Sequence, residues 1–90
     1  MRTDLRIQAK CNEIAEFLIE KNNSYGDSAL HPISVFASGD AVANLNARID
    51  DKLARIRNAP LAYGEDVVKD LTGYLVLLQL AMEDQNRTEK

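Results

Sequence analysis

Apolar residues recur every three or four positions along three stretches of the chain, and polar, turn-forming residues separate these stretches. Spacing of this kind puts the apolar side chains on one side of a helix that turns by about 100° per residue. No stretch shows the strict alternation of a half-buried strand. The pattern therefore predicts an all-α fold with three main helices, at about residues 3–22, 40–58 and 65–82.

The connections between the predicted helices differ in length. Turn-forming residues make 22–32 a long loop, and residues 33–38 allow a short helical turn before the second helix, for which Asp40 is the N-cap candidate. Only a short segment around Pro60 joins the second and third helices, so these two should form an antiparallel hairpin. We expect one helical domain over residues 1–90, with a polar tail at about 84–90 that frays.

The third predicted helix, Glu65 to Met82, has an uneven distribution of side chains. A polar strip of Asp66, Asp70 and Gly73 runs beside the apolar face of its first half. From Tyr74 onward the helix is apolar nearly all round, which is typical of a helix buried on every side. Two neighbouring helices cannot cover that much apolar surface, so the sequence predicts a homo-oligomer, most simply a dimer.

Composition narrows the class of protein. The chain has 90 residues and a formal net charge of −3, which argues against a general nucleic-acid binder. Its single cysteine, Cys11, lies on the apolar face of the first helix and is expected to be a buried thiol in a reducing cytoplasm. There is neither a signal-peptide pattern nor an apolar run of the ~20 residues that span a membrane, so we expect a cytoplasmic protein without membrane partners.

Three groups of charged and aromatic residues border the apolar stripes and are candidates for ligand binding. They are Lys21, Tyr25, Gly26 and Asp27 at the end of the first helix and in the loop after it; Arg48, Lys52 and Arg55 on the second helix; and Asp66, Asp70 and Tyr74 on the third. Lys and Arg could meet a phosphate, Tyr could stack on a base, and Asp could accept hydrogen bonds from sugar hydroxyls. The alternative is structural: a solvated loop in which tyrosine plugs the core, and an ion network between the second and third helices.

The three groups belong to short sequence blocks with a family resemblance. The blocks read K-x-x-x-Y-G-D from Lys21, R-I-x-D-K-L-x-R-I from Arg48 and E-D-x-x-x-D-L-x-G-Y from Glu65. Their order resembles that of small phage-encoded helical proteins of unknown function, of MazG-like or nucleotide-modification-associated type, over about residues 14–80. The resemblance implies a phage or prophage origin, an all-helical fold and a link to nucleotides, but no established activity.

MazG-type pyrophosphatases hold Mg²⁺ over a triphosphate with an E-E-x-x-E block and an E-x-x-D block one helix later. By this resemblance, Glu16 and Glu20, in a run that begins at Glu13, would stand for the first block, and Asp66 and Asp70 for the second. Both blocks depart from the pattern, since the leading Glu pair is absent and the second spacing is D-x-x-x-D. The glutamates also point away from the apolar face of their helix, whereas a metal cage needs inward carboxylates.

Three functions are therefore open at the level of sequence. The first is binding of a nucleotide or nucleotide-derived signal without turnover and without a cofactor, which would suit a phage protein that sequesters host immune signals. In an oligomer, such a site would combine the Tyr25-Gly26 loop of one chain with the charged border of another. The second is a Mg²⁺-dependent MazG-like nucleotide pyrophosphohydrolase. The third is an oligomeric protein–protein interaction module.

Overall fold

Three helices make up the computed structural model, which describes residues 2–32, 39–62 and 64–88. They are α1 (Arg2–Ser24), α2 (Ala41–Asn58) and α3 (Gly64–Thr88), and this part of the chain contains no strand. The all-α prediction is confirmed. The helical turn predicted at 33–38 lies outside the described residues.

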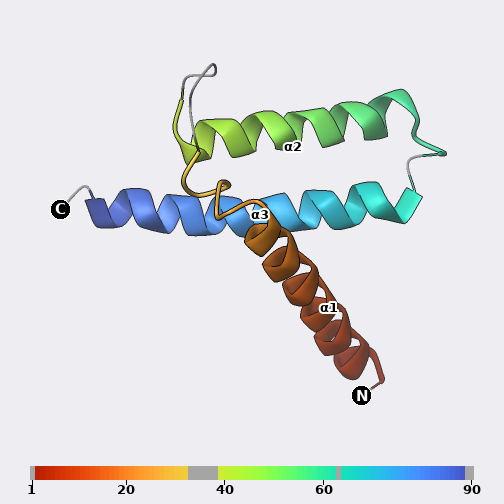
Figure 1. The fold of residues 1–90 in the computed structure, drawn as a ribbon. Helices are drawn as coiled ribbons and strands as arrows, with labels where there is room; N and C mark the ends of the chain where they lie inside the picture. Colours follow the sequence, from red (N-terminus) through yellow and green to blue (C-terminus); the bar gives the residue numbers. More distant parts are fainter. Residues whose placement is uncertain (1, 33–38, 63, 89–90) are drawn as a thin grey trace.

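Helices α2 and α3 form the predicted antiparallel hairpin and lie side by side along most of their length (Figure 1). Among the described residues, the buried apolar side chains all belong to this pair: Leu45, Val67 and Ala81. Asp40 caps α2 as predicted, since its Oδ1 accepts a hydrogen bond from the Ala43 backbone N–H at 2.9 Å. Its Oδ2 accepts a second hydrogen bond, at 3.0 Å, from the Gln85 side chain of α3. The same carboxylate therefore caps α2 and fastens it to α3.

Helix α1 leaves the hairpin at a steep angle, and its N-terminal half projects from the molecule (Figure 1). Its C-terminal half touches α3, where Leu18 packs on Gly73. A Cβ placed on Gly73 would lie 2.7 Å from Cδ2 of Leu18. A glycine inside a helix costs about 1 kcal/mol against alanine, and close contact between two helices accounts for this one.

The projecting position of α1 overturns one expectation and agrees with another. Cys11, predicted to be buried, is exposed because neither of the other two described helices covers the N-terminal half of α1. The second half of α3 is not covered on every side within one chain either, since its apolar residues Leu75, Val76, Leu80 and Met82 are 38–46% exposed. The hairpin partner and one crossing helix cover only part of its circumference.

Two further features concern the helix ends. Helix α3 continues past the predicted end at Met82 to Thr88, and fraying of these last turns stays a prediction. No described helix combines the length and the apolar character that crossing a membrane requires.

The Leu18–Gly73 contact can be tested with a double-mutant cycle. In a Leu18→Ala background, Gly73→Ala should raise the free energy of unfolding by about 1 kcal/mol, because the helix gains propensity and nothing opposes the new methyl group. In the wild-type background the gain should be smaller or absent, because Leu18 must move. Urea denaturation of the four proteins gives the comparison, and equal gains in both backgrounds would contradict the contact.

Candidate functional site

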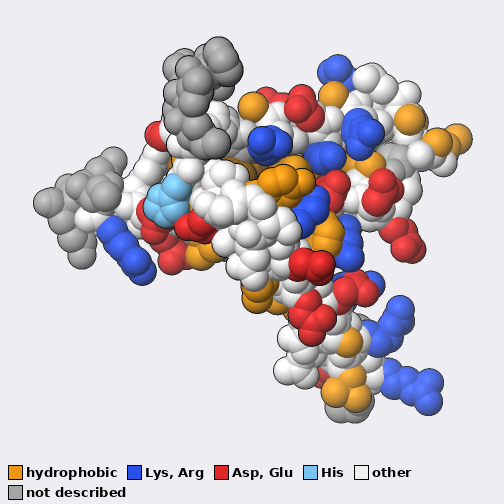
Figure 2. Space-filling model, viewed as in Figure 1, with side chains coloured by type: hydrophobic (Ala, Val, Ile, Leu, Met, Phe, Trp, Pro, Cys, Tyr) orange, Lys and Arg blue, Asp and Glu red, His pale blue; other side chains and the backbone are white. Residues whose placement is uncertain are grey.

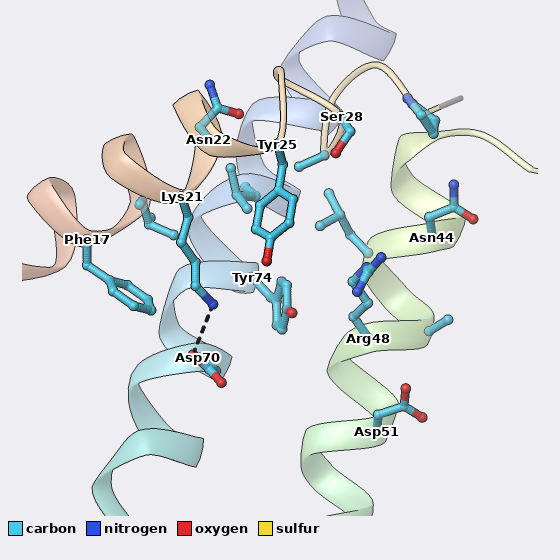
Figure 3. A pocket seen from close by; sticks show the side chains of 16 residues that line it. Phe17, Lys21, Asn22, Tyr25, Ser28, Asn44, Arg48, Asp51, Asp70 and Tyr74 are labelled. Carbon is cyan, nitrogen blue, oxygen red and sulfur yellow. Dashed lines mark ion pairs between the residues drawn. The ribbon is translucent and has the colours of Figure 1, made fainter. Parts of the chain in front are cut away.

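A pocket of about 650 Å³ lies where α1, the loop after it, α2 and α3 meet (Figure 3). Its apolar wall comes from all three helices and includes Phe17, Leu45 and Leu77. Of the predicted ligand-binding residues, five line it: Lys21, Tyr25, Arg48, Asp70 and Tyr74. The structure thus gathers half of the predicted site in one place.

Asp70 of α3 connects the other two helices at one side of this pocket. Its Oδ2 lies 3.3 Å from Nζ of Lys52 on α2, and its Oδ1 lies 4.0 Å from Nζ of Lys21 on α1. The Lys52 side chain is only 16% exposed, so this pair is partly shielded from water. The acidic border of α3 and the basic border of α2 therefore face each other at Asp70, and the contact there is the ion network that the sequence offered as the structural alternative.

Lys21 makes a second contact on its way to Asp70. Its ammonium lies 4.9 Å from the centre of the Phe17 ring, and the Lys69 ammonium lies 4.4 Å from the same ring. Cations attract the face of an aromatic ring at these distances. Lys21 is therefore held between an aromatic ring and a carboxylate at the α1–α3 crossing.

Arg48 has a different environment from the two lysines. Within residues 2–32, 39–62 and 64–88, no carboxylate lies within ion-pair distance of its guanidinium. It extends from α2 toward the Tyr74 and Tyr25 side chains (Figure 3). An exposed arginine of this kind keeps its donors available for an anion, because no protein acceptor compensates its charge.

Tyr25 reaches the pocket from the loop after α1. Its backbone N–H donates to the Lys21 carbonyl at 3.0 Å, and the chain then turns through two left-handed residues, Gly26 (φ 60°) and Asp27 (φ 64°). Figure 3 shows the Tyr25 ring between α1 and α2, above Tyr74 in this view. Since Tyr25 is 68% exposed, it does not plug the core. Within one chain, Tyr25 of this loop and Arg48 of α2 line the same pocket. The expected combination of the loop with the charged border of another chain stays a prediction.

The remaining predicted residues lie elsewhere. Gly26 shapes the turn without lining the pocket, and Asp27 faces away toward His31, with Oδ2 at 3.3 Å from its Nε2. Lys52 contacts Asp70 from outside the lining. Arg55 and Asp66 line a separate, open hollow of about 460 Å³ at the closed end of the hairpin.

Some residues of the pocket were missed by the sequence analysis. Asn44 lies one helical turn before Arg48, so the 3–4 spacing that selected Arg48 could have found it. Phe17 was not among the candidate residues of the sequence, and Ser28 sits in a loop without periodicity. For Ser28 the sequence carries no signal.

The carboxylates of the enzyme alternative do not come together within the described residues. This part of the chain contains no group of three or more His, Cys, Asp or Glu side chains placed to hold a metal ion. Glu16 and Glu20 are exposed on α1, while Asp66 and Asp70 line different hollows. Glu13 is also on the surface, where a hydrogen bond from Lys10 and the Lys10 charge lower the pKa of its carboxyl.

Comparison of the chain with protein-family models, curated proteins and solved structures gives no match.

Removing the Asp70 charge tests whether the ion network holds the helices together. Asp70→Asn should lower the free energy of unfolding by about 1–2 kcal/mol, because Lys52 keeps a partly shielded charge without a counter-ion. Asp51→Asn is the matched control, because Asp51 also lines the pocket but is exposed and has no ion pair with a described residue. Its effect should stay within about 0.5 kcal/mol in urea denaturation. Equal effects of the two changes would contradict a structural role for Asp70.

Proposed function

We propose that this chain binds a nucleotide or nucleotide-derived signal in the pocket between its three helices and does not turn it over. The observation that carries the proposal is the Arg48 guanidinium, which has no ion pair with a described residue and borders a pocket containing two tyrosines. A phosphate beside an aromatic base is the ligand chemistry that this combination fits.

Each part of such a ligand has a counterpart in the lining. A guanidinium group donates two parallel hydrogen bonds to phosphate oxygens, so Arg48 is the residue proposed to bind the phosphate. Tyr25 and Tyr74 offer faces on which a base can stack, and Leu45 and Leu77 offer apolar surface beneath it. A volume of about 650 Å³ lies within the ~300–1,000 Å³ of typical small-molecule sites.

The charge of the lining favours a ligand with few phosphate charges. The charged side chains of the pocket are the cations Lys21 and Arg48 and the carboxylates Asp51 and Asp70, which cancel formally. A triphosphate would bring several negative charges into a site without a surplus of cations. A monophosphate or a phosphodiester matches the single unpaired arginine better.

Binding without turnover is the simpler proposal for this arrangement. The glutamates and aspartates of the MazG-like alternative are dispersed over the described part of one chain. The resemblance to small phage proteins adds the proposed context, a cytoplasmic protein that sequesters a host signalling nucleotide.

Incubation of the purified protein with nucleotide pools, with and without Mg²⁺, tests the proposal. We expect the protein to retain an intact nucleotide with low phosphate charge, independently of Mg²⁺. Metal-dependent release of pyrophosphate would instead support the enzyme. If the protein neither retains a nucleotide nor releases pyrophosphate, the protein–protein interaction module remains as the function.

The role of Arg48 is tested by Arg48→Ala, with Arg57→Ala as the matched control on the opposite side of α2. For the retained nucleotide, Arg48→Ala should raise Kd by about tenfold or more, the loss expected for a charge-assisted hydrogen bond. Arg57 is exposed and does not line the pocket, so its replacement should leave Kd unchanged. Calorimetric titration gives both constants, and circular dichroism checks that the helices persist. Equal affinities for the two variants would remove Arg48 from the site.

A further inference from the structure

A single chain exposes far more surface than a compact protein of its size. Its accessible surface is 7186 Å², whereas a folded monomer of 10.0 kDa has about 5,200 Å². The radius of gyration is 14.9 Å, against about 12 Å for a compact domain of this length. The excess of about 2,000 Å² is more than the ~800 Å² that one partner buries in a standard interface, and it is comparable with larger obligate interfaces.

Part of this exposed surface lies on α1, next to the place where α1 packs on α3. Ile7 and Cys11 precede Leu18 by eleven and seven residues, so they lie on the same stripe of the helix that packs on Gly73. Beyond the crossing no other helix of the described chain packs on this stripe, and Ile7 is 58% exposed. Figure 2 shows hydrophobic atoms among charged ones on this projecting half.

The α3 side of the contact continues in the same way. Val76 and Leu80 follow Gly73 by three and seven residues, which places them on the face that Leu18 touches. They are 38% and 41% exposed. Both helices of the crossing therefore present apolar surface that their own chain leaves uncovered.

We infer that a second copy of this chain covers these two stripes, with the projecting half of each α1 packed against the other copy. A two-fold arrangement suits this geometry, because each copy supplies one projecting α1 helix and one uncovered apolar face of α3 beside the crossing. The charges along α1 favour antiparallel pairing of the two α1 helices. Residues 2–10 carry Arg2, Arg6 and Lys10 with one carboxylate, whereas residues 13–20 carry three carboxylates and no cation.

Antiparallel pairing would bring the basic turns of one α1 alongside the acidic turns of the other. The area and the exposed stripes support this interface independently of the proposed ligand. It accounts for the exposure of Cys11 in the isolated chain and gives the predicted oligomer a defined surface.

Sedimentation over a range of concentrations tests the interface. The wild-type chain should form an oligomer, and Ile7→Glu and Val76→Glu should each weaken its association by about tenfold or more, because each change buries a carboxylate. The matched controls are Ala9→Glu on the opposite side of α1 and Val68→Glu on another face of α3, both at exposed positions. The controls should associate like the wild type.

A measurement without substitution guards against variants that fail to fold. Cys11 is the only cysteine, so its reaction with a thiol reagent reports on this stripe alone. The thiol should react slowly in the concentrated wild-type protein and faster on dilution. A monomeric mass at every concentration, a thiol that reacts equally fast throughout, or an oligomer that tolerates both stripe substitutions would overturn the inference.

Discussion

The contact between Leu18 and Gly73 determines how the rest of the molecule is arranged, because it is where α1 meets the hairpin. A Cβ at position 73 would lie 2.7 Å from Cδ2 of Leu18, so glycine allows the present approach without a shift of that side chain. The approach carries the end of α1 over α3, so that Lys21 reaches Asp70 and the following loop brings Tyr25 opposite α2. It also directs the first half of α1 away from the hairpin. The pocket and the uncovered stripe are two consequences of one crossing.

Asp70 shows that a structural ion network and a binding site need not exclude each other. Its carboxylate takes up the charges of Lys52 and Lys21, and both interactions exist before any ligand arrives. Two of the basic residues near the pocket are thus committed to holding the helices. Arg48 lies one turn before Lys52 on α2 and has no such partner among the described residues. The ion network therefore distinguishes the cations that hold the fold from the one that can serve an anion.

The 3–4 spacing of apolar residues was enough to predict the helices and the hairpin, and it identified the charged residues that border the apolar stripes. It could not predict which residues of one border line the same pocket. Arg48 and Arg55 share a border but are seven residues apart, or about 10 Å along the helix, so they line separate hollows. The crossing angle of α1 could not be predicted from the sequence either. An apolar stripe shows which side of a helix packs, but it does not show how far along the helix its neighbour extends. That is why Cys11 was placed in a core that a single chain does not provide.

Within the proposed site, the groups that can contribute to affinity are those whose interactions are incomplete in the free protein. The Lys52–Asp70 pair is already formed, so a ligand gains little from it. Tyr25 is 68% exposed, and a base stacked on its ring would remove apolar surface from water that the chain alone leaves exposed. Arg48 offers donors that no described carboxylate uses. Affinity should therefore depend on a loop residue and an α2 residue that contribute little to the hairpin core, which lets the site be altered without dismantling the fold that positions it.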